Sequence, residues 1–121
     1  MTKRVLDIGN CGPDHGAIER MIRSNFDAEV DAAHTGADAM PMLTSQNYDL
    51  VMVNRILDID GSSGMQVITD VLRDFPKVPV MLITNYEEHQ QAAVDAGAVR
   101  GFGKNAVEAP GTAELLSDYL S

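Results

Sequence analysis

The chain has 121 residues, of which 45% are hydrophobic, and its formal net charge is −9. This length suits one modest core, so we expect residues 1–121 to form a single domain. The acidic balance argues against a basic face that binds nucleic acid. The one cysteine, Cys11, excludes an internal disulfide and favours a reducing compartment. Because no apolar run approaches the roughly 20 residues of a membrane helix, and a signal peptide's apolar stretch is missing, we expect a cytoplasmic protein.

Short apolar runs alternate with helix-like segments along the chain. Five strands are predicted, over residues 4–9, 28–33, 49–54, 78–84 and 99–103. Five helices are predicted, over residues 13–25, over 35–46, before Pro76, up to Gly97 and over 112–120. This alternation predicts an α/β fold in which crossover helices join parallel strands.

Local signals refine the helix boundaries. Thr35 and Asp38 have the spacing of a capping box, and Asn85 and Glu88 have the same spacing before the fourth helix. Pro41 falls inside the second helix and predicts a kink or a late helix start.

Ligands of open parallel sheets bind beyond the carboxyl ends of the central strands. The polar and small residues at those ends are the candidate site: Gly9, Asn10, Asn54, Thr84 and Lys104.

Several stretches, in this order and spacing, carry a resemblance to a known family. They are residues 33–40, residues 48–54, Asp60-Gly61, residues 79–84, Ala96-Gly97-Ala98 and Lys104. Together they resemble the receiver domain of bacterial response regulators. The resemblance implies a three-layer α/β/α, flavodoxin-like (CheY-like) fold with a five-stranded parallel sheet in the order 2-1-3-4-5.

The resemblance also implies a mechanism. In that family an aspartate at the end of the third strand accepts a phosphoryl group, and an acid pair helps it to hold Mg²⁺. A hydroxyl residue, a lysine and an aromatic residue contact or report the phosphoryl group. Thr84 and Lys104 match the hydroxyl residue and the lysine.

The other positions depart from the family pattern. Asn54 stands in place of the phosphoacceptor, and an amide cannot form the acyl phosphate. Gly9 and Asn10 occupy the acid-pair positions, Gly101 the aromatic position, and Asn105 replaces the proline after the lysine. We therefore expect a pseudo-receiver in phosphorelay signalling that is not an enzyme, has no catalytic or metal-ligating residues, needs no cofactor and binds Mg²⁺ weakly or not at all.

In the family, the fourth helix, fifth strand and fifth helix form an output face. The corresponding residues are Tyr86, Gln90, Arg100, Phe102 and Tyr119. We expect a protein partner or a second copy of the chain to bind there.

Other functions stay open. The domain could sense a small anion or metabolite through Thr84 and Lys104, since Lys104 would face a pocket without its usual negative charge. Phosphorylation could have moved to Asp58 or Asp60. Residues 5–13 also resemble the first glycine-rich motif of class I methyltransferases, which binds S-adenosylmethionine, although Asn10 interrupts it.

Two further sets of residues carry expectations. Asp7 lies mid-strand, and we expect it either to meet Lys104 or a polar backbone group, or to be partly solvated. Cys11 is expected to be inert. The three histidines, His15, His34 and His89, are dispersed and are expected to lie on the surface.

Overall fold

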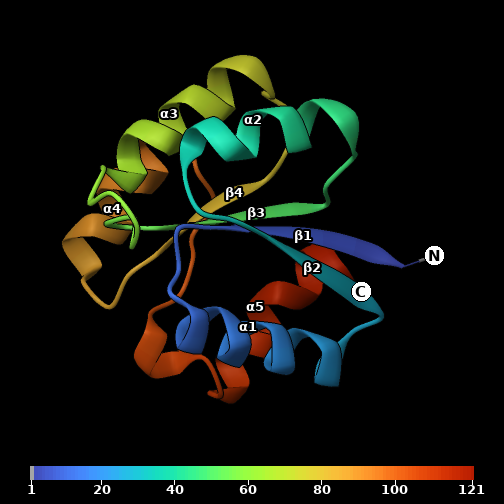
Figure 1. The fold of residues 1–121 in the computed structure, drawn as a ribbon. Helices are drawn as coiled ribbons and strands as arrows, with labels where there is room; N and C mark the ends of the chain where they lie inside the picture. Colours follow the sequence, from blue (N-terminus) through green and yellow to red (C-terminus); the bar gives the residue numbers. More distant parts are fainter. Residues whose placement is uncertain (1) are drawn as a thin grey trace.

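The computed structural model describes residues 2–121 and arranges them in three layers (Figure 1). The strands are β1 (Lys3–Ile8), β2 (Ala28–Ala33), β3 (Leu50–Asn54) and β4 (Val80–Ile83), and the helices are α1 (Gly12–Asn25), α2 (Gly36–Ser45), α3 (Gly64–Asp74), α4 (Glu87–Asp95) and α5 (Pro110–Leu120). The expected three-layer, flavodoxin-like architecture is confirmed. Among residues 2–121, no helix has the length and apolar character needed to span a membrane.

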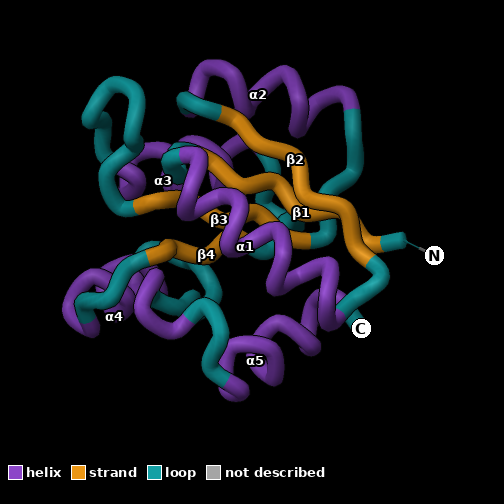
Figure 2. The backbone as a smooth tube through the Cα atoms, turned by 60° about the horizontal axis from the view of Figure 1, so that its bottom comes forward, coloured by secondary structure: helices purple, strands orange, loops and turns teal. Residues whose placement is uncertain are grey.

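The four strands are parallel and follow the order β2-β1-β3-β4. The central strand β3 is buried along its whole length, because helices cover both faces of the sheet. On one face pack α2, α3 and α4, with apolar side chains such as Ala39, Ile68 and Ala93. On the other face pack α1 and α5, through residues such as Ile18 and Leu116 (Figure 2).

The helix signals are confirmed in part. Thr35 is the N-cap of α2, and its side-chain oxygen accepts a hydrogen bond from the Asp38 amide at 3.0 Å. The late start predicted from Pro41 is wrong, because α2 begins at Gly36 and contains Pro41. The cap predicted at Asn85 is also wrong: α4 begins after Tyr86, and the Asn85 side-chain oxygen accepts from the Asn105 amide instead, at 3.0 Å.

The predicted fifth strand over residues 99–103 is wrong as well. Only Val99 forms a ladder pair with β4, opposite Met81. One step further along, the Gln90 side chain enters the space between β4 and this segment. Its amide donates to the Leu82 carbonyl at 3.0 Å, and its side-chain oxygen accepts from the Gly101 amide at 3.0 Å. The side chain takes the place of one ladder hydrogen bond, so the pairing is interrupted there, although the Thr84 amide still donates to the Phe102 carbonyl at 3.1 Å.

Candidate functional site at the carboxyl edge of the sheet

The strand ends bring three of the predicted site residues into one pocket. Asn54 ends β3, Thr84 follows β4, and Lys104 opens a 3₁₀ turn after the segment beside β4. All three line a pocket of about 190 Å³. Its other lining residues are Arg55, Ile56, Ile83, Asn85 and Tyr86. Gly9 and Asn10, at the end of β1, do not line it.

Asn54 is buried and its side-chain amide is fully engaged as a donor. Its Nδ2 donates to the Gly9 carbonyl at 3.1 Å and to the Ile56 carbonyl at 2.7 Å. These two bonds tie the end of β3 to the end of β1 and to the following loop. A carboxylate has no hydrogen to donate, so an ionised aspartate in this position would point oxygen at both carbonyls.

The Gly9 position does not accommodate an acidic side chain in this geometry. Its φ is +80°, a conformation that side chains other than glycine rarely adopt. A Cβ atom there would also collide with the Leu57 side chain. The backbone conformation at Gly9 and the position of Leu57 therefore both disfavour an acidic residue here.

Asn10 belongs to a cluster with the buried Asp7 and the partly exposed His15. Asn10 Nδ2 donates to Asp7 Oδ1 at 2.5 Å, and His15 Nδ1 lies 2.7 Å from Asp7 Oδ2. Asp7 is only 1% exposed and is bonded to two side chains, so the expected contact with Lys104 or a polar backbone group and the alternative of partial solvation are both wrong. The hydrogen bond to the Asp7 carboxylate raises the pKa of His15, against a smaller opposing effect of burial. His15 is therefore an ion-pair partner in α1 and not merely a surface residue.

Lys104 has a carboxylate partner that the sequence did not suggest. Its Nζ lies 2.8 Å from Asp14 Oδ2, in the first turn of α1. The ammonium group lowers the pKa of Asp14, assisted by the Cys11 thiol, which donates to the same carboxylate at 3.2 Å. The pocket that Lys104 lines with Asn54 and Thr84 contains no carboxylate of the described residues, as expected, but α1 supplies a counter-ion for Lys104 from outside that pocket.

Thr84 is held by its neighbours on both its backbone and its side chain. Its carbonyl accepts from the Gln90 amide at 3.2 Å, and its amide donates to the Phe102 carbonyl at 3.1 Å. Its hydroxyl oxygen accepts from the Tyr86 amide at 3.3 Å. Beside it, a Cβ at Gly101 would collide with the Leu82 carbonyl oxygen, so no aromatic side chain fits that position here.

The predicted output face needs correction. Gln90 is 4% exposed and Phe102 is 6% exposed, so neither can be part of a surface. Gln90 is occupied by the backbone bonds described above, and Phe102 packs in the core between the sheet and α1 and α5. Tyr86 and Arg100 are exposed, Arg100 in an ion pair with Glu87, and Tyr119 is partly exposed.

The donors at the site fit Mg²⁺ poorly. Among residues 2–121, no cluster of three or more histidine, cysteine or carboxylate side chains could hold a metal ion. Asn10 Oδ1 is buried without a hydrogen-bond partner, but it is one neutral oxygen. Mg²⁺ releases its water reluctantly and is bound through carboxylates. The carboxylate that Asn10 bonds is that of Asp7, which also holds His15.

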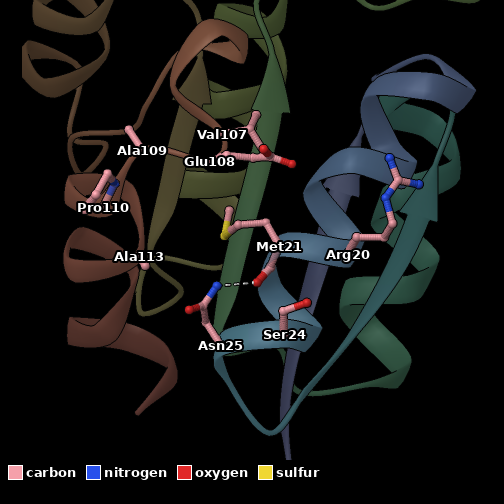
Figure 3. Close-up of a pocket in the computed structure, with 9 residues that line it drawn as sticks. All are labelled: Arg20, Met21, Ser24, Asn25, Val107, Glu108, Ala109, Pro110 and Ala113. Carbon is pink, nitrogen blue, oxygen red and sulfur yellow. Dashed lines mark hydrogen bonds between the residues drawn. The ribbon is translucent and has the colours of Figure 1, made fainter.

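A larger pocket lies elsewhere, between α1 and the start of α5 (Figure 3). Its volume is about 420 Å³, and Met21, Asn25 and Pro110 are among its lining residues. Asn25 Nδ2 donates to the Met21 carbonyl within its wall at 2.8 Å. None of the predicted site residues lines this pocket.

The parallel sheet, its covering helices and the polar strand ends define a receiver-type α/β domain. The sequence pattern of the family described as "Response regulator receiver domain" matches residues 15–110. The chain therefore belongs to this family of two-component signalling domains, and the expected CheY-like identity is confirmed at that level.

Individual relatives agree with this assignment. The "Uncharacterized transcriptional regulatory protein YhcZ" of Bacillus subtilis is 28% identical over 92 residues, which are 70% of this chain and 42% of that protein. A response regulator from Thermotoga maritima has a similar fold, with a TM-score of 0.81, 19% identity, and coverage of 98% of both chains. An orphan response regulator of H. pylori gives a TM-score of 0.77 at 20% identity, covering 98% of this chain and 97% of that one.

Proposed function

We propose that this chain is a receiver domain that works without aspartyl phosphorylation and transmits signals by contact with a protein partner. The observation that carries the proposal is the pair of hydrogen bonds from the Asn54 amide to the Gly9 and Ile56 carbonyls. A buried polar group is stable when its partners are complementary to it. The site is complementary to an amide and opposes the carboxylate that phosphorylation requires.

The metal requirement supports the same conclusion. Phosphoryl transfer to a carboxylate needs positive charge at the transferred oxygens, which a bound metal ion usually supplies. Gly9 has no side chain, and the Asn10 amide is directed to Asp7. We infer that the domain needs no Mg²⁺ and has no catalytic residue.

Gln90 supports a constant conformation. Its side chain is buried and bonds the backbones of Leu82, Thr84 and Gly101 together. A signal that moved Thr84 would have to break these bonds in an interior where unsatisfied groups are costly. We infer that the surface beside α4 is presented permanently, with Tyr86, Arg100 and Tyr119 as the accessible members of the predicted output face.

The alternatives have less support. The anion-sensing function is weakened, since Asp14 already pairs with Lys104. Asp60 is committed to its own loop, where its Oδ1 accepts from the Ser62 amide at 2.9 Å and from the Ser62 hydroxyl at 2.7 Å. The methyltransferase alternative has no supporting observation, and the match to the receiver family argues against it. The one cysteine fits the reducing cytoplasm, where we place the chain. The net negative charge fits a protein partner better than direct binding to nucleic acid.

The test is the intact mass of the full chain after incubation with acetyl phosphate and Mg²⁺. We expect no phosphoryl adduct on the native chain. Asn54→Asp, run beside it, reports whether the missing nucleophile is the only obstacle, and we expect it too to remain unmodified because the acid pair is missing. An adduct on the native chain that hydroxylamine removes would contradict the proposal.

A further inference from the structure

Exposed apolar side chains gather at the carboxyl edge of the sheet. Of the four large hydrophobic residues that are exposed among residues 2–121, three lie there: Ile56, Ile59 and Tyr86. Ile56 and Ile59 belong to the loop between β3 and α3, and Tyr86 precedes α4. This loop and the start of α4 lie at the same end of the molecule, opposite both termini (Figures 1 and 2). Large side chains left in water at one site indicate a binding surface.

The pocket between Ile56 and Tyr86 has an unusual charge for this chain. Two cations, Arg55 and Lys104, line it, and no carboxylate does, although the net charge is −9. Asp14 matches Lys104. Arg55 has no carboxylate within ion-pair distance among residues 2–121, and its guanidinium carbon lies 5.7 Å from the Tyr86 ring centroid. The pocket therefore fits an apolar side chain that has a carboxylate beside it.

The chain itself presents such a group in the same loop. Ile59 is 63% exposed and stands between two exposed aspartates, Asp58 and Asp60. The loop is held in shape by backbone bonds, from the Asp58 amide to the Gly9 carbonyl at 2.9 Å and from the Gly61 amide to the Leu57 carbonyl at 2.9 Å. An ordered loop that offers isoleucine between two acids is complementary to the pocket beside it.

We propose that the occupant of this pocket is a second copy of the chain. In the dimer, Ile59 of each copy packs against Ile56 and Tyr86 of the other, and Asp58 of each copy pairs with Arg55 of the other. Because donor loop and acceptor pocket adjoin on one surface, a two-fold axis satisfies both at once, as an isologous interface requires. This inference rests on the proposed function, since it needs the surroundings of Asn54 to remain unmodified.

Both copies carry a net negative charge and repel each other, so the dimer is expected to be weak and to need salt that screens this repulsion. Each copy carries a net charge of −9. At physiological ionic strength the Debye length is about 8 Å, which screens the long-range repulsion but leaves close pairs attractive. The apolar contact, which salt does not weaken, supplies the rest of the driving force.

The experiment is sedimentation velocity on the full chain at physiological ionic strength, from about 10 μM to about 1 mM, a range that covers weak association. We expect a concentration-dependent monomer–dimer equilibrium in the native chain. Ile59→Asp should weaken it at least about tenfold, because it removes the apolar anchor. Val94→Asp is the matched control, since Val94 is the fourth exposed large hydrophobic and lies in α4; it should leave the dimer unchanged.

A mixing experiment tests the pairing itself. Arg55→Asp and Asp58→Arg should each be monomeric alone, because like charges face each other twice in either homodimer. Mixed in equal amounts they should form a heterodimer, since one Arg–Asp pair is then native and the other is reversed. Circular dichroism of each variant alone confirms that it is folded.

Three results would overturn the proposal. The first is a native chain that stays monomeric throughout the concentration range. The second is a dimer that Ile59→Asp leaves intact or that the mixture fails to restore. The third is a monomeric native chain that binds a labelled peptide with isoleucine between two aspartates in an Arg55-dependent manner, because the occupant would then belong to another protein. These experiments use the unmodified chain, so a dimer that fails to form would leave the result of the mass measurement unchanged, and the two failures can be told apart.

Discussion

The Asp7 carboxylate in β1 and the His15 imidazole in α1 form a close pair, with Oδ2 and Nδ1 2.7 Å apart. Asp7 is almost completely buried, whereas the His15 side chain keeps 22% of its surface in solvent. The His15 ring therefore lies between the buried Asp7 carboxyl group and the solvent. The strength of the pair should depend on whether that ring is protonated.

The sign of the pH dependence follows from the His15 pKa, which is raised in the folded chain. A group whose pKa rises on folding stabilises the fold fully below its unfolded value of about 6.5 and loses that contribution as the pH rises through the folded value. We expect unfolding by urea at a series of pH values to show this loss above about pH 6.5. His15→Gln should remove it, and His34→Gln, at an exposed position, should not. An unchanged pH profile in His15→Gln would contradict the ion pair.

Gln90 provides a second prediction. Gln90→Met keeps the volume but leaves the Leu82 and Thr84 carbonyls and the Gly101 amide without their partner. Buried groups left unsatisfied cost about 1–3 kcal/mol each, so we expect the free energy of unfolding to fall by about 2 kcal/mol or more. Hydrogen exchange at the Gly101 amide should accelerate as well. Gln91→Met, at the next and exposed position of α4, is the control and should have little effect; equal losses in the two variants would contradict the bridging role.

Gly101 supplies a third prediction. A Cβ at this position collides with the Leu82 carbonyl oxygen, whereas one at Gly111 meets nothing within 4 Å. Gly101→Ala should therefore destabilise the chain by about 1–3 kcal/mol in urea unfolding, as overpacking does. Gly111→Ala should be near neutral. Similar stabilities for the two variants would mean that position 101 has room for a side chain such as the aromatic residue of the family.

Sequence patterns predicted the layers and the strand ends well because both depend on local signals. The apolar run of β3 and the turn residues around each helix place Asn54 and Thr84 near one edge of the sheet, where the structure has them. Asn54, Thr84 and Lys104 were accordingly predicted as neighbours from their positions in the chain alone.

The errors concern contacts between residues of different elements. No periodicity indicates that Gln90, on α4, reaches the backbone beside β4 and so interrupts the pairing of residues 99–103 with that strand. The Lys104–Asp14 pair joins residues 90 positions apart, and nothing in their spacing indicates it. The Asp7–His15 pair was accessible in principle, because a mid-strand aspartate needs a partner and His15 lies close in the chain.

The most direct test of the central claim is the stability of Asn54→Asp. An ionised carboxylate at this buried position would face the Gly9 and Ile56 carbonyls, which now accept hydrogen bonds from the amide. The measurement is the free energy of unfolding in urea at neutral pH, with Asn47→Asp at an exposed loop position as the control. A site built for an amide predicts a loss of about 1–3 kcal/mol or more in Asn54→Asp and little change in the control. An Asn54→Asp chain as stable as the native one would show that the site accepts a carboxylate and would contradict the account.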